Sequence, residues 1–139
     1  RLGQLIQDSM PYSFENIIAW QKAHQFTLNV YRLTKHFPQE ETFCLTSQFR
    51  RAAVSIEANI AEGSKRLSRK AKLNFFNISQ GSLEECRNYI ILSKDLGYLD
   101  NQNAQSLFDN IELTSKFLNA YCKAIASNSG IDDNIKEDN

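Results

Sequence analysis

The sequence contains few of the residues that interrupt long helices. Its 139 residues include only two prolines and five glycines. A β sandwich or barrel needs turn residues about every 8–12 positions, so this scarcity favours helices. No apolar run approaches the roughly 20 residues that cross a bilayer, and the first residues lack the apolar core of a signal peptide. We therefore expect a single helical domain with no membrane partner.

Residues that could carry catalysis or bind a metal are also few. His24 and His36 are twelve residues apart, which turns them about 120° out of register on one helix, so they cannot share a metal ion. Cys44, Cys86 and Cys122 form no CxxC pair, which predicts reduced thiols in a cytoplasmic protein. Neither the ExxH motif of di-iron bundles nor the HExxH motif of zinc enzymes is present. We predict a protein that is not an enzyme and has no cofactor.

The formal net charge is zero, but positive and negative charges lie in different parts of the chain. Residues 46–83 contain seven bases and two acids, a local charge of 7 − 2 = +5, so the rest of the chain carries −5. Part of this negative charge lies near the end, in Asp132, Asp133, Glu137 and Asp138. Because the sequence from residue 127 onward is polar and acidic, we expect a disordered acidic tail at 127–139.

Hydrophobic periodicity predicts four helices, at residues 15–36, 46–63, 69–96 and 103–126. Ser13 or Asn16 is expected to cap the first helix, and Ser68 the third. Gly63 and Gly97 are expected to end the second and third helices in the left-handed conformation. Four long helices with short links favour an antiparallel up-down four-helix bundle. A more irregular all-α arrangement is the alternative.

The predicted second helix presents three different faces when its residues are placed about 100° apart. Its large apolar face comprises Leu45, Phe49, Ala52, Ile56 and Ile60. Its opposite face is small and comprises Ser47, Val54, Ala58 and Ala61. Between them runs a polar line of Gln48, Arg51, Ser55, Asn59 and Glu62. We assign the apolar face to the core and the small face to close helix contact. The polar line is either a buried network that fixes helix register or part of a ligand site.

The first and third helices each have a second face that a peripheral bundle helix does not need. On the first helix this stripe is aromatic and contains Trp20, His24 and Tyr31, which indicates a deeply placed helix or a subunit interface. On the third helix the second side is small, and Gly81 within it predicts close backbone approach. These extra faces favour association of the bundle with copies of itself.

Basic residues gather around the expected link between the second and third helices. The candidate contacts are Arg50, Lys65, Arg66, Arg69, Lys70 and Lys72. Because free N–H groups and the helix dipole favour anions at a helix start, we expect this link to bind the phosphates of RNA or DNA. No motif for reading bases is visible. The alternative is a scaffold that recruits a protein partner and carries a merely solvated basic loop.

Several stretches carry a resemblance to a known family. The strongest are W-Q-K-A at 20–23, F-P-Q-E-E at 37–41 and L-T-S-Q-F-R-R-A-A-V-S-I-E-A-N-I-A-E-G at 45–63. With G-S-L-E-E at 81–85 and L-G-Y-L at 96–99, they make residues 14–126 resemble the four-helix bundle proteins named after 23S rRNA intervening sequences. Two positions depart from that pattern, Glu57 where proline is common and Cys44 where glycine is frequent.

The resemblance implies an all-α bundle that assembles into a homo-oligomer, a pentameric ring, in the bacterial cytoplasm. Residues 14–126 would form the bundle domain, after a flexible N-terminal segment at 1–13. Some relatives are encoded inside inserts of ribosomal RNA genes, and a distantly similar bundle protein is a nucleic-acid-binding accessory of a reverse transcriptase. The resemblance implies no settled activity, so the expectation of nucleic-acid binding rests on the basic residues.

Overall fold

Four long helices account for most of the described chain. The structure is a computed structural model that describes residues 12–127. Its elements are η1 (Ser13–Asn16), α2 (Ile18–Thr34), η2 (Gln39–Glu41), α3 (Leu45–Ser64), α4 (Arg69–Asp95) and α5 (Asn101–Ser127). No strand occurs within this range, and the prediction of an all-α chain with four helices is confirmed. The predicted flexible segment at 1–13 and the predicted acidic tail at 127–139 fall almost wholly outside the described residues.

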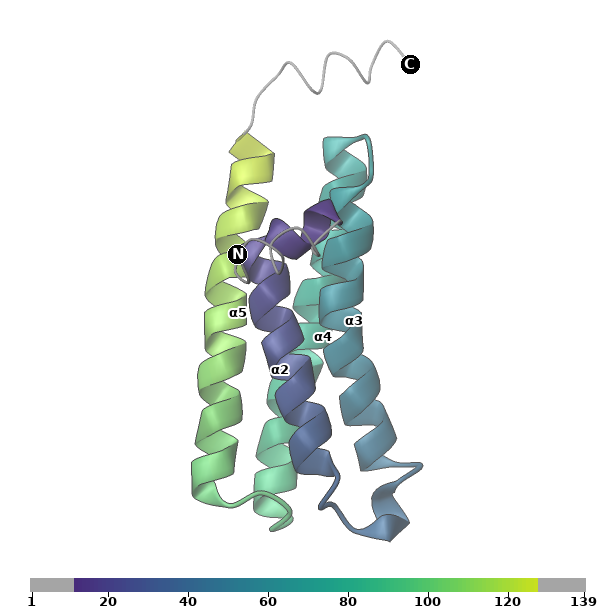
Figure 1. The fold of residues 1–139 in the computed structure, drawn as a ribbon, viewed down its shortest axis with the longest axis vertical. Helices are drawn as coiled ribbons and strands as arrows, with labels where there is room; N and C mark the ends of the chain where they lie inside the picture. The colour runs from purple at the N-terminus through teal and green to yellow at the C-terminus, as the bar shows by residue number, and fades with distance from the viewer. Residues whose placement is uncertain (1–11, 128–139) are drawn as a thin grey trace, which may run out of the picture.

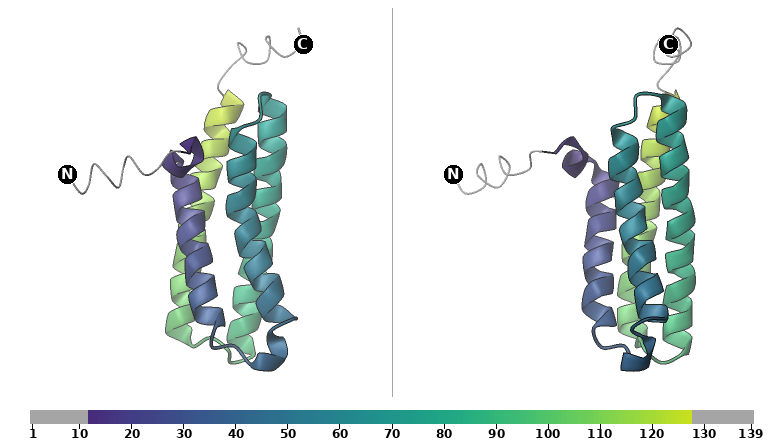
Figure 2. Two further views of the ribbon diagram at one scale, coloured as in Figure 1. Left: turned by 45° about the vertical axis from the view of Figure 1, so that its right-hand side comes forward. Right: turned by 90° about the vertical axis from the view of Figure 1, so that its right-hand side faces the viewer.

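The helices lie side by side, and the chain passes from each helix to a neighbour (Figure 1, Figure 2). α3 packs against α2 and α4, and α5 packs against α4 and α2. Hydrogen bonds between α3 and α4 join Gln48 to Tyr89, Ser55 to Ser82 and Ile56 to Ser79. Rising residue numbers on α3 therefore meet falling numbers on α4, and the short α3–α4 link lies at one end of the bundle (Figure 1).

The core is built from apolar residues at helical spacing on all four helices, and on α3 it is the predicted large apolar face. α2 contributes Ala19, Ala23, Phe26, Val30 and Leu33, and α3 contributes Leu45, Phe49, Ala52, Ile56 and Ile60. α4 contributes Phe76, Leu83 and Ile90, and α5 contributes Ala104, Leu107, Ile111 and Leu118. None of these side chains is more than 7% exposed. Burial of this apolar surface is the main favourable term that holds the four helices together.

The start of α2 differs from the prediction. The helix begins at Ile18 and not at residue 15, because Ile17 is extended with φ −79° and ψ 119°. Neither Ser13 nor Asn16 caps it, and both belong to the separate turn η1. α5 also begins earlier than predicted, at Asn101. The helix interiors follow the apolar periodicity, whereas the helix starts depend on local backbone geometry.

Two of the three predictions about glycine are wrong. Gly63 lies inside α3 without positive φ, and it is needed because a Cβ there would meet Cε1 of Phe76 at 2.6 Å and Cβ of Phe75 at 2.9 Å. Gly81 lies inside α4, but nothing is within 4 Å of the place a Cβ would take, so close backbone approach does not explain it. Gly97 ends α4 with φ 82°, as predicted.

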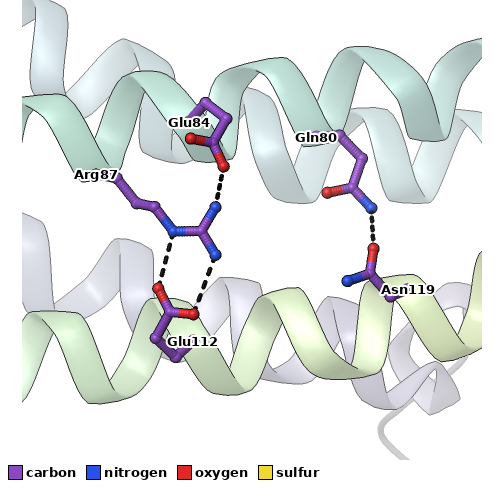
Figure 3. A network of polar contacts seen from close by, with 5 residues as sticks. All are labelled: Gln80, Glu84, Arg87, Glu112 and Asn119. Carbon is purple, nitrogen blue, oxygen red and sulfur yellow. Dashed lines mark hydrogen bonds and ion pairs between the residues drawn. The ribbon is translucent and has the colours of Figure 1, made fainter.

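Polar side chains join α4 to α5 (Figure 3). Arg87 Nε and Nη2 donate to the two carboxylate oxygens of Glu112 at 2.8 and 3.1 Å, and Arg87 Nη1 also donates to Glu84. Further along, Gln80 Nε2 donates to Asn119 Oδ1 at 2.7 Å. The hydrogen-bonded guanidinium of Arg87 holds the pKa of the Glu112 carboxyl below its usual range.

Candidate nucleic-acid interface

The α3–α4 link occupies residues 65–68 between two long helices. Ser68 caps α4 as predicted, because its Oγ accepts a hydrogen bond from the Ala71 N–H at 2.9 Å. Leu67 is 94% exposed. We use the name basic junction for the cations of this link and of the first turn of α4, which are Lys65, Arg66, Arg69, Lys70 and Lys72. The structure brings these five predicted residues together.

Two cations of the basic junction bind the carboxyl ends of other helices. Lys72 Nζ donates to the Ser64 carbonyl at 2.7 Å, at the end of α3. Arg69 Nη1 donates to the Ala126 carbonyl at 2.7 Å, at the end of α5. The last carbonyls of a helix have no partner within the helix and carry a partial negative charge, so a cation there is stabilising. Arg69 and Lys72 therefore have a structural role that the sequence did not reveal.

The remaining cations of the basic junction face solvent. Lys65, Arg66 and Lys70 are all exposed. The Arg66 guanidinium lies over the Phe75 ring, 4.6 Å from its centroid, which orients the cation without neutralising it. Within residues 12–127, Lys65 and Lys70 have no ion-pair partner. Three cations are thus exposed on the link and the first turn of α4.

Arg50 does not belong to the basic junction. It lies in the second turn of α3, whereas the link follows the last turn, about 20 Å along the helix axis. Its Nε donates to Thr34 Oγ1 at 2.8 Å, and its guanidinium lies 4.7 Å from the centre of the Tyr31 ring. This arrangement joins α3 to α2. The structure therefore places Arg50 apart from the other cations, near the opposite end of α3, and its contact with nucleic acid stays a prediction.

The polar line of α3 lies along a groove between α3 and α4. Ser55 is at its centre, where Asn59 Nδ2 donates to its Oγ at 3.0 Å and Ser82 Oγ donates to it at 2.8 Å. Gln48 and Arg51 also line the groove. Arg51 and Glu62 are exposed, so the line as a whole is not a buried network. Gln48 and Ser55 of the line link the two helices, through Tyr89 and Ser82 of α4.

The aromatic stripe of α2 packs partly against its own chain. Trp20 and His24 stack with ring centroids 4.8 Å apart, and Phe14 of η1 meets Trp20 edge-on at 5.1 Å. His24 Nδ1 lies 2.9 Å from a carboxylate oxygen of Glu57 on α3. Glu57, which stands where proline is common in the resembling family, thus pairs with His24 of α2. Tyr31 is 39% exposed. Most of the stripe that predicted a subunit interface already has neighbours within the chain.

A second apolar surface lies on α4 and was missed by the sequence reasoning. Ile78, Leu92 and Leu96 are 51%, 41% and 49% exposed. Their spacing places them on one face of the helix, together with Tyr89 and Glu85 of the α3–α4 groove. We call this the outer α4 face. Ile78 and Leu92 are fourteen residues apart and Leu96 follows four residues later, a spacing that returns each to nearly the same side of a helix.

The three cysteines differ in burial. Cys44 is exposed, Cys86 is buried and Cys122 is half-buried, and all three are free. Burial raises the pKa of the Cys86 and Cys122 thiols, which lowers the fraction of reactive thiolate. In the part of the chain that the structure describes, no three His, Cys, Asp or Glu side chains could hold a metal ion. Nor is any helix of that part long and apolar enough to span a bilayer.

The architecture defines an all-α protein of four helices with a basic link at one end. Residues 15–120 match the family described as 23S rRNA-intervening sequence protein, and the chain belongs to that family. A solved structure from Bacteroides thetaiotaomicron, described as a protein with unknown function from the S23 ribosomal protein family, has a TM-score of 0.70 at 24% identity. The match covers 76% of this chain and 96% of that chain. This likeness establishes the fold alone. No curated protein matches the chain.

Proposed function

We propose that this protein is a non-enzymatic, antiparallel up-down bundle that binds RNA or DNA through its basic junction. The observation that carries the proposal is the exposure of Lys65, Arg66 and Lys70 on the α3–α4 link and the adjoining first turn of α4. Arg69 and Lys72 hold the ends of α5 and α3 and thereby fix that link. Phosphate contacts of this kind gain affinity by releasing counterions and carry no sequence information.

Three cations in one chain give a small footprint, so the proposal includes self-association. A homo-oligomer, a pentameric ring in the bacterial cytoplasm as the family resemblance implies, would repeat the basic junction around an axis. Avidity then raises the affinity for one long strand without any new contact. The exposed Ile78, Leu92 and Leu96 support association, because a monomer gains nothing from leaving such an apolar stripe in water.

The first experiment compares two variants with equal loss of charge. K65Q/R66Q/K70Q removes the outward cations, and K35Q/K94Q/K116Q removes three exposed lysines elsewhere on the chain. Fluorescence anisotropy with a labelled single-stranded RNA and a DNA duplex at about 50 mM salt measures the affinity. We expect the first variant to bind about tenfold more weakly or worse, and the second to bind much as the parent protein does. Equal weakening in both variants would contradict the assignment to the basic junction.

Light scattering tests the association. I78E/L92E places charges on the outer α4 face and should convert the assembly to monomers without loss of helix content. L28E alters an exposed position of the α2 stripe, 57% exposed and one turn from Tyr31. If L28E dissociates the protein and I78E/L92E does not, the interface lies on α2 near Trp20, His24 and Tyr31. A parent protein that is a monomer at all concentrations would refute the association.

The second candidate function is a scaffold that recruits a protein partner. The same outer α4 face favours it, because an apolar face beside a polar groove suits a partner helix as well as another copy. Under this alternative the basic junction is solvated and nucleic acid does not bind. The anisotropy experiment therefore separates the two functions directly.

A further inference from the structure

Acidic residues follow α5 in the sequence. Asp132, Asp133, Glu137 and Asp138 provide four negative charges, and Lys136 provides one positive charge, which gives 1 − 4 = −3 for this short stretch. We call residues 132–138 the acidic segment. Its charge is opposite to that of the basic junction.

The end of α5 lies directly beside the start of α4. The Arg69 Nη1 atom is 2.7 Å from the carbonyl oxygen of Ala126, one residue before α5 ends at Ser127. The α3–α4 link and the end of α5 therefore share one end of the bundle (Figure 1, Figure 2). The described chain therefore ends beside the basic junction, and the acidic segment begins a few residues later in the sequence.

The chain is long enough to bring the two charges together. Four residues lie between Ser127 and Asp132, and the five steps of extended chain from one to the other span at most about 17 Å. Lys65, Arg66 and Lys70 lie within four positions of Arg69, the residue that touches the end of α5. A short tether of this kind gives an effective concentration on the order of millimolar. The acidic segment can therefore occupy the basic junction through ion pairs that would be too weak to bind a separate peptide.

We propose that the acidic segment binds the basic junction of its own chain and competes there with phosphate. The carboxylates take the places that nucleic-acid phosphates would take, on Lys65, Arg66 and Lys70. The competition rests on the proposed function, but the contact between acidic segment and basic junction does not. The basic junction is then a site for an acidic peptide, and the protein itself carries the occupant.

Cross-linking tests the contact without nucleic acid. A water-soluble carbodiimide joins a carboxylate to an amine when the two are in ion-pair contact. In the full chain, mass spectrometry should find cross-links from Lys65 or Lys70 to the acidic segment, lost at about 0.5 M salt because the contact is screened. Lys94, which is exposed near the other end of α4, is the matched control. Cross-links to Lys94 as frequent as those to Lys65 and Lys70, or none to the basic junction, would overturn the proposal.

A mixture of isotope-labelled and unlabelled protein, refolded together, shows whether the contact lies within one chain. Cross-links within single chains are expected. Cross-links that mostly join labelled to unlabelled chains would place the contact between subunits and overturn the proposal as stated.

A further experiment measures the affinity of the variant D132N/D133N/E137Q/D138N for nucleic acid. This variant removes the negative charges and keeps the length of the chain. At about 50 mM salt this variant should bind RNA or DNA about two- to tenfold more tightly than the parent protein, and the difference should vanish at high salt. An unchanged affinity, with the parent protein binding well, overturns the competition. If neither protein binds nucleic acid, the proposed function fails, and the cross-links alone decide the contact.

Discussion

At the scale of single residues, Gly63 shows how closely α3 and α4 approach each other. The position is buried, and a Cβ there would lie 2.6 Å from a ring atom of the fully buried Phe76. Phe76 cannot move away easily, because its ring also packs against Tyr121 at 5.0 Å between centroids. Overpacking of a dense core forces side chains off their preferred rotamers or shifts the backbone. The glycine at the end of the family motif is therefore explained by packing and not by a left-handed turn.

Gly63→Ala should lower the free energy of unfolding by about 1–3 kcal/mol, because the overlap with Phe76 outweighs the better helix propensity of alanine. Gly81→Ala is the matched control, since it adds the same methyl group inside a helix where nothing lies within 4 Å. That variant should gain about 0.5–1 kcal/mol. Urea unfolding followed by circular dichroism measures both. A stabilised Gly63→Ala protein would show that the α3–α4 contact is looser than the structure has it.

The basic junction contains exposed cations and cations that bind helix ends, and the sequence alone does not distinguish the two kinds. A run of bases near a helix start predicts an anion site, and the structure leaves Lys65 of the link and Lys70 of the first turn of α4 exposed. It could not separate Arg69 and Lys72 from them. The carbonyl that Arg69 binds belongs to Ala126, 57 residues away, and only the packing of α5 against α4 brings the two together. Such long-range partners have no local signal.

At the scale of the elements, α4 has two unlike sides. Toward α5 it carries the polar contacts of Arg87 and Gln80, whereas its outer face carries Ile78, Leu92 and Leu96. The apolar core stripes could be predicted, because each repeats at helical spacing over several turns. The boundary between core and surface on α4 could not be predicted. An apolar residue at the edge of a core stripe has the same spacing in the sequence whether a neighbouring helix covers it or not. The polar side fixes how α4 and α5 lie against each other without burying charge.

The pH dependence of stability in the Glu112→Gln variant tests the polar contact between α4 and α5. The pKa of Glu112 is lowered in the folded protein, mainly by its hydrogen bonds from Arg87. Because the pKa is lowered, the pair stabilises the folded protein at pH values above 4.5, the ordinary pKa of Glu. This contribution disappears as the pH falls through the pKa of Glu112 in the folded protein. Because the Glu112 side chain is 59% exposed, the loss at neutral pH should be under about 1 kcal/mol.

Urea midpoints of the parent protein and of Glu112→Gln, measured between about pH 3 and pH 7, should therefore differ at neutral pH and converge in acid. Glu40→Gln, at an exposed glutamate of η2 with no ion pair among the described residues, is the control and should show no such convergence. A constant difference for Glu112→Gln across this range would mean that the Arg87 contact does not depend on the charge of Glu112.

At the scale of the whole molecule, the zero net charge conceals a polarised bundle. One end carries the basic junction, and the other carries Glu40, Glu41, Asp95 and Asp100 against Lys35 and Lys94, around η2 and the α4–α5 link. Repetition of such a unit around an axis, as proposed here, would gather the basic ends on one side. The family match and the fold agree on the bundle, and neither specifies an activity. The proposed function therefore depends on whether the basic end binds phosphate.

The salt dependence of nucleic-acid binding tests that claim most directly. Each phosphate contact made by a cation contributes about −0.7 to −0.9 to the slope of log K against log salt. Lys65, Arg66 and Lys70 together should give a slope of about −2 to −3 for each bound chain, and K65Q/R66Q/K70Q should bring it close to zero. An equal slope in parent and variant, or no binding of RNA or DNA at about 50 mM salt, would contradict the account.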